Sequence, residues 1–176
     1  MVDGEAILVG DTILPEIAPH PTLESSFTVM KPVLPEKFGE AQQLFGLRAY
    51  IRSFKMLGAV TGSTHKPLVL PAHRLYYKDQ FNQLDLHTRI DDLVQHHLTR
   101  CHEILEILSS GPKTPTEIAR HYFSPDLLKG FGINMAVNEV KSHCELMEIS
   151  EDVVLLENEK ISSTGAENFR LLVSNL

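Results

Sequence analysis

The chain has 176 residues, 43% of them hydrophobic, which suits one or two small soluble domains with ordinary cores. No apolar run is long enough to span a bilayer, so we expect no membrane partner. The net charge of −7 belongs entirely to residues 81–176, because acidic and basic side chains balance in residues 1–80; this acidity disfavours nucleic acid as a partner, since phosphate contacts need clustered basic side chains.

The chain begins with a short apolar run and a long proline-rich segment. Ala6–Val9 predicts a buried strand, which Gly10 and Asp11 interrupt. The segment from Leu14 to Glu36 contains five prolines, which disfavour regular helix and central strand. We therefore expect a long ordered loop there, a kind of segment that is often functional in compact domains.

A helix and a second strand are predicted after this loop. From about Phe38 to Leu57, apolar residues recur at three- and four-residue steps, as an amphipathic helix requires. The residues on its apolar face are Leu44, Leu47, Ile51 and Phe54. The glycines that we expect to end it are Gly58 and Gly62. Leu68–Leu70 predicts a short strand, and Pro71–Arg74 is the loop that directly follows it.

Three helices are predicted in the second half. An apolar stripe from near residue 82 to Leu108 predicts a helix of about seven turns. Thr114–Glu117 has the spacing of a capping box with proline at the first helical position, and it predicts a short helix through about Phe123. A third helix is predicted from about Asn134 to Glu148.

The end of the chain predicts a β-hairpin. Its two apolar runs are Val153–Leu156 and Ile161–Ser163, separated by the polar residues 157–160. Three helices followed by a hairpin is the order of a winged-helix domain. We therefore predict an α+β chain with two domains, residues 1–80 and residues 81–176, the second of them mostly helical and winged-helix-like.

The two cysteines indicate a reducing compartment. Cys101 and Cys144 lie far apart, lack CxxC spacing and fall on the apolar faces of predicted helices, so we interpret them as reduced core residues. The N-terminus also lacks the basic and apolar regions of a signal peptide. Together these features favour a cytoplasmic location.

Asp11 and His73 are the residues with the strongest chemical signal, because each comes directly after a predicted strand. In open α/β sheets the strand ends line the ligand crevice, and carboxylate and imidazole are both zinc ligands. Residue chemistry alone leaves two interpretations open: a pair of metal ligands, or a turn aspartate and a surface histidine. A catalytic zinc takes three protein ligands and a water molecule, so the pair is not a complete site.

Two segments resemble the late metal-ligand motifs of metallo-β-lactamase-fold hydrolases, namely Val9–Pro21 and Leu68–Arg74. The first segment of that family carries an aspartate shared by two metals, and the second carries a histidine that binds the second metal. The resemblance implies that Asp11 and His73 are zinc ligands and that residues 1–80 are the C-terminal part of an αββα metallo-β-lactamase-like domain. The helical tail resembles the branch of the family that carries a C-terminal winged helix, some of whose members cleave RNA.

The chain departs from the family pattern in its remaining metal motifs. The His-x-His-x-Asp-His cluster and the further histidine that precede the shared aspartate are absent, because only ten residues precede Asp11. The usual Pro-Gly-His-Gly motif is Pro71-Ala-His-Arg74 here, and Arg74 would place a cation beside the expected ligand. We therefore expect a truncated relative of zinc-dependent hydrolases of ester, thioester or phosphodiester bonds, inactive as a lone chain.

Part of a two-sheet domain would leave strand edges and an apolar face uncovered. We therefore expect a homodimer, another chain that completes the domain, or repacking of this segment on the helical tail. One alternative function is a non-catalytic dimerisation or interaction module. The other is a winged-helix regulator that binds nucleic acid, which the predicted recognition helix 134–148 disfavours because it carries three glutamates and one lysine.

Other residues carry weaker signals. His20, in the proline-rich loop, is either a substrate-binding residue of the family's cleft or a solvated side chain. A three-histidine metal patch is not expected on the long helix, because His97 lies on its apolar stripe and its neighbouring histidines do not. The sequence indicates no recognisable pairing for Glu16 and Glu24, and it names no partner for His121 and His143.

Overall fold

The computed structural model describes residues 5–61, 66–81 and 83–176. Contacts divide the chain into two compact units, of which the first comprises residues 1–20 and 50–96 and the second comprises residues 21–49 and 97–176. These two units are groups of residues that pack together. The predicted boundary near residue 80 instead separates two domains by their resemblance to known families, and it stays a prediction.

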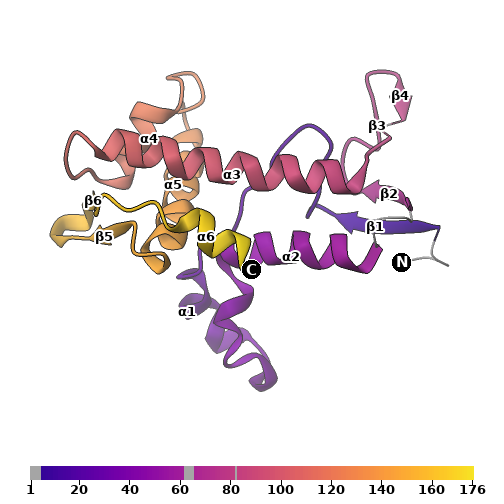
Figure 1. The fold of residues 1–176 in the computed structure, drawn as a ribbon, viewed down its shortest axis with the longest axis horizontal. Coiled ribbons are helices and arrows are strands. Elements are labelled where there is room, and N and C mark those ends of the chain that lie inside the picture. The colour runs from indigo at the N-terminus through magenta and orange to yellow at the C-terminus, as the bar shows by residue number, and fades with distance from the viewer. Residues whose placement is uncertain (1–4, 62–65, 82) are drawn as a thin grey trace. The chain divides into compact units, whose positions relative to one another are not determined.

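The first unit is built on a two-stranded parallel sheet formed by β1 (Ala6–Gly10) and β2 (Leu68–Pro71), which Figure 1 shows side by side. This confirms both predicted strands. Helices α2 (Gly46–Thr61) and α3 (Leu86–Leu108) supply the other members of its core. The buried residues that pack together are Ile7, Val9, Ile13, Phe54, Val69, Leu86, Ile90 and Leu93.

The predicted bounds of helix α2 are wrong at both ends, since the helix covers Gly46–Thr61 and not 38–57. Gly46 has a φ of +84°, a left-handed conformation that interrupts a right-handed helix. A side chain there would also meet the Cβ of Glu24 at 2.8 Å, so glycine is required. The preceding residues form two separate 3-10 turns, Glu36–Phe38 and Ala41–Leu44.

The apolar face of α2 is confirmed for the residues that lie inside the helix. Leu47, Ile51 and Phe54 are buried, whereas Leu44 precedes the helix and is exposed. Gly58 does not end α2, which continues to Thr61. The other glycine expected to end it, Gly62, lies outside the described residues.

The proline-rich segment contains more structure than the sequence predicts. Helix α1 (Ser26–Met30) leads into a 3-10 turn, Lys31–Val33. The sequence between Pro21 and Pro32 is free of proline, which leaves room for one helical turn, and Pro32 stands at the start of the 3-10 turn, where its missing N–H is not needed.

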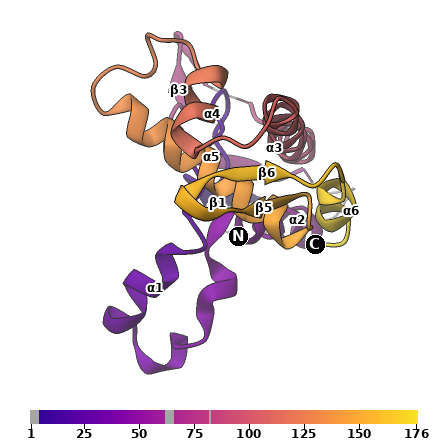
Figure 2. The same cartoon turned by 90° about the vertical axis from the view of Figure 1, so that its left-hand side faces the viewer.

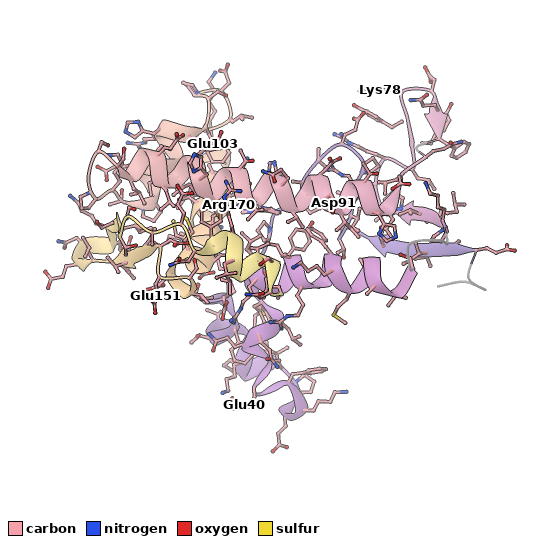
Figure 3. The ribbon with its side chains drawn as sticks, in the orientation of Figure 1. Glu40, Lys78, Asp91, Glu103, Glu151 and Arg170 are labelled. Atoms are coloured by element: carbon pink, nitrogen blue, oxygen red, sulfur yellow. The ribbon has the colours of Figure 1, made fainter. Side chains whose placement is uncertain are left out.

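A second hairpin was not predicted. Strands β3 (Tyr76–Tyr77) and β4 (Gln80–Phe81) pair antiparallel in the first unit. The two turn residues, Lys78 and Asp79, have φ values of +52° and +60°, and Figure 3 labels Lys78 at the tip. Turns of this kind are usually recognised by Asn-Gly or Asp-Gly, which this chain lacks here.

The second unit contains the predicted helices and terminal hairpin. After the residues of α3 come α4 (Pro115–Tyr122) and α5 (Gly132–Ile149). The hairpin of β5 (Val153–Leu155) and β6 (Ile161–Ser163) follows, and Figure 2 shows it beside α5. The capping box at Thr114 and Glu117 is present. The final helix, α6 (Phe169–Ser174), was not predicted.

The core of the second unit includes both cysteines, which are buried and unoxidised, as the sequence indicates. Their burial raises the pKa of Cys101 and raises that of Cys144 to about 12. Within the described ranges, no helix combines the length and the apolar character that crossing a bilayer requires.

Candidate metal-ligand site

The parallel pairing of β1 and β2 brings Asp11 and His73 together. The register runs from Ala6 opposite Leu68 to Gly10 opposite Pro71, so both strands end at the same edge. The Ala72 N–H donates to the Gly10 carbonyl at 2.9 Å, which continues the pairing beyond the strands. His73 Nε2 consequently lies 3.2 Å from Asp11 Oδ1, and both side chains are about two-thirds exposed (67% and 65%).

Two residues from the helices hold the loop that follows Asp11. The hydroxyl of Tyr50 on α2 donates to the Thr12 carbonyl at 2.7 Å, and burial raises the pKa of Tyr50. Arg89 on α3 donates to the carbonyls of Leu14 and Ile17 at 2.8 and 3.0 Å. These contacts fix the turn that presents Asp11, and the periodicity of the sequence did not indicate either of them.

In the loop after β2, the positive charge of Arg74 is paired with an acidic side chain, which the sequence does not indicate. The Arg74 guanidinium forms an ion pair with Glu16 at 3.0 Å and lies 4.8 Å from the centre of the Tyr77 ring. Lys78 pairs with the other oxygen of Glu16 at 3.2 Å. Glu16, for which the sequence indicates no pairing, therefore has two cationic partners, and it counters the charge of Arg74.

The backbone of Arg74 has an unusual conformation for a residue with a side chain. Arg74 has a φ of +61°, a left-handed conformation that glycine adopts freely and that a bulky side chain adopts at a cost. An arginine therefore occupies a backbone conformation that glycine adopts more readily.

The separation of Asp11 and His73 matches two positions of a tetrahedral zinc site. Zinc–ligand distances of about 2.0–2.1 Å place two ligand atoms roughly 3.3 Å apart, close to the 3.2 Å observed. The same distance also suits a direct hydrogen bond. No group of three His, Cys, Asp or Glu side chains suited to a metal occurs in the part of the chain that the structure describes. The donor set is thus compatible with zinc but incomplete.

Three other histidines have sequence features that were considered above. His20 is partly buried in the first unit, and its role in substrate binding stays a prediction. His97 on α3 and His143 on α5 are both buried in the second unit, with His97 Nδ1 3.1 Å from His143 Nε2. His143 Nδ1 lies 2.7 Å from the Glu139 carbonyl, which can only accept, so this nitrogen donates. The sequence names no partner for His143, and the structure supplies His97 and the Glu139 carbonyl.

Glu24, for which the sequence indicates no pairing, is bonded in the middle of the proline-rich segment. Its carboxylate accepts a hydrogen bond from Arg48 at 2.9 Å, and its N–H donates to Glu145 at 2.6 Å. Sequence reasoning missed both pairs, because the partners lie 24 and 121 residues away along the chain.

No profile of a known protein family matches this sequence, and no curated protein matches it closely enough to count as a relative. Solved structures do match the fold. A metallo-β-lactamase family protein from Thermus thermophilus superposes with a TM-score of 0.62 at 20% identity, over 92% of this chain and 42% of its own. A β-lactamase domain protein from Burkholderia ambifaria gives 0.57 and 18% over the same shares. The chain thus has a metallo-β-lactamase-like fold and spans less than half the length of these structures.

Proposed function

We propose that this chain is the C-terminal part of a metallo-β-lactamase-like, zinc-dependent hydrolase, in which Asp11 and His73 supply two of the metal ligands. Asp11 would be the ligand shared by two metals, and His73 would bind the second metal. The observation that supports this proposal is the 3.2 Å separation of the two side chains at the aligned ends of parallel strands. The likeness of the fold to structures more than twice as long adds to it.

The remaining ligands would have to come from outside the described residues. Bound zinc supplies Lewis acidity, and an ester, thioester or phosphodiester is the class of bond that we assign to the substrate. The residues of this chain would orient the site: Tyr50 and Arg89 fix the turn that carries Asp11, while Glu16 counters Arg74 beside His73. Because the set is incomplete, we propose that the chain alone does not hydrolyse such bonds.

Zinc titration of the purified chain by calorimetry, slightly above neutral pH, tests the ligand roles. We expect weak binding that Asp11→Ala and His73→Ala each abolish. Matched controls remove an exposed aspartate and an exposed histidine elsewhere, in Asp91→Ala and His121→Ala, and should bind zinc as the unmodified chain does. Zinc affinity that is unchanged in both site variants would overturn the assignment.

The proposed inactivity has its own measurement. The chain is incubated with zinc and with chromogenic ester, thioester and phosphodiester substrates. We expect no turnover above that of Asp11→Ala. Hydrolysis that depends on Asp11 would contradict the need for further ligands while supporting the metal assignment.

A second candidate function is a non-catalytic dimerisation or interaction module, with a second copy or a completing chain as partner. The exposed face of the β1–β2 sheet favours it, because Leu8 and Leu68 are 69% and 56% exposed there. Parallel sheets are nearly always covered on both faces. Sedimentation of the purified chain tests this candidate, because self-association would support it and an isolated monomer would count against it.

The tail is proposed to be a winged-helix domain, which the order of α3, α4, α5 and the β5–β6 hairpin supports. Nucleic-acid binding by it is disfavoured. On α5, Glu139 pairs with Arg100, Glu145 accepts backbone N–H groups, and Glu148 is exposed. We also propose a cytoplasmic location, because both cysteines are buried and free, as is usual in a reducing compartment.

A further inference from the structure

A groove of about 310 Å³ lies within the second unit, between α5 and the β5–β6 hairpin. One wall is a single face of α5, because Cys144 and Glu145 lie three and four residues after Lys141 and four and three residues before Glu148. Residues of the hairpin form the opposite wall. None of these residues belongs to the candidate metal-ligand site.

The floor of this groove is apolar. Cys144, Val153 and Ile161 line it and are each less than a tenth exposed. Leu155 stands on the hairpin side and is 61% exposed, so much of its apolar surface remains open to a partner. Burial of an apolar side chain against these residues would be favourable, because it removes apolar surface of both molecules from water.

The rim of the groove is acidic. Glu148 and Glu159 are exposed, Glu145 is partly buried, and Lys141 is the cation that lines the groove with them. Both oxygens of Glu145 accept backbone N–H groups, from Glu24 at 2.6 Å and from Ser25 at 3.1 Å. These bonds fix the carboxylate at the rim without neutralising its charge. The groove therefore presents an apolar floor with a net negative border.

We propose that this groove binds a peptide segment of a partner protein in which an apolar side chain is flanked by Lys or Arg. The apolar side chain would enter against Leu155 and the floor, and the flanking cations would face Glu148 and Glu159. Such complementarity governs partner selection and association rate more than affinity. The same charges disfavour nucleic acid, whose phosphates would meet glutamates.

Fluorescence anisotropy of the full chain with a short labelled peptide of alternating Leu and Arg tests the proposal. We expect saturable binding that weakens with salt. The double variant Glu148→Gln/Glu159→Gln should bind about fivefold more weakly, from two exposed ion pairs of roughly 0.5 kcal/mol each. Leu155→Ser changes an exposed residue, so it should keep the fold, and it should also weaken binding.

The matched control is Glu157→Gln, which removes a charge from the same hairpin turn at a residue outside the groove lining. It should bind the peptide as the unmodified chain does. Amide shifts in nitrogen-15 spectra should concentrate in residues 141–148 and 153–161. Equal binding by the groove variants and the control, shifts located elsewhere, or tighter binding of duplex DNA than of the peptide would each overturn the proposal.

Discussion

Asp152 is a fully buried carboxylate whose two oxygens both accept hydrogen bonds. The Ser150 hydroxyl and the Phe169 N–H donate to Oδ2, each at 2.7 Å, and the Asn168 N–H donates to Oδ1. A negative charge at the start of α6 is also favourable to the helix dipole. Asp152 therefore joins the residues after α5 to the beginning of α6.

We expect Asp152→Asn to lower the free energy of unfolding by about 1–3 kcal/mol. The amide keeps one acceptor, but its NH₂ group faces a donor, so one buried hydrogen bond is lost. Urea denaturation measures the change. The control Asp126→Asn alters a highly exposed residue that pairs with Lys129 three residues along, and it should change stability by less than about 0.5 kcal/mol. Equal effects of the two variants would contradict the role of Asp152.

The candidate site was predictable in part at this scale. Asp11 and His73 could be singled out because each follows an apolar run, and parallel pairing then places strand ends together. Their surroundings could not be predicted. The Glu16–Arg74 pair joins residues 58 positions apart, and the His97–His143 pair joins residues 46 apart. No periodicity in the sequence encodes such pairs, because they depend on how the elements pack.

At the scale of elements, the start of helix α4 is stabilised by hydrogen bonds in its first turn. The Glu117 N–H donates to the Thr114 hydroxyl at 3.2 Å, and the Thr114 N–H donates to the Glu117 carboxylate at 2.8 Å. These reciprocal bonds satisfy two backbone donors that the helix cannot pair internally. The Thr114 N–H and then its side chain hold the pKa of Glu117 below its ordinary value.

We expect Thr114→Ala to destabilise the chain by about 1 kcal/mol in urea unfolding near neutral pH, because the cap is lost. Thr114→Ser should restore it, and Thr116→Ala, in the same turn but without a cap bond, should have little effect. The lowered pKa of Glu117 means that its contribution is present above the unfolded pKa and disappears as pH falls through the folded value. The difference between Thr114→Ala and the unmodified chain should therefore shrink in acid; a constant difference would contradict the reciprocal bond.

Elements with strong local signals were the predictable part of the fold. The capping box marked the start of α4, and apolar periodicity marked α3 and α5. Elements that depend on backbone geometry or tertiary capping were missed. The β3–β4 turn has positive φ at Lys78 and Asp79, a backbone conformation that residues other than glycine rarely adopt. Helix α6 has six residues, and the N–H of its first residue, Phe169, donates to Asp152, which lies 17 residues earlier, so no local sequence pattern predicts it.

At the scale of the whole molecule, the β1–β2 sheet has one buried and one exposed face. Ile7, Val9 and Val69 are buried, while Leu8 and Leu68 are exposed. Both strand sequences are apolar on both faces, the pattern of a parallel strand covered on each side. In the described part of the chain this sheet has two strands, so each strand also has an edge that another strand can extend.

We therefore expect the purified chain to self-associate, with a weight-average mass that rises with concentration in sedimentation equilibrium. Leu8→Glu and Leu68→Glu should each shift it toward monomer, because a charge on this face must be desolvated to be covered. Both residues are exposed, so the variants should keep their folded spectra. The control Leu171→Glu places the same charge at a residue of α6 that is 65% exposed and should leave association unchanged. Association that persists equally in all three variants would show that another surface mediates it, while a monomer at every concentration would leave this face to a different chain.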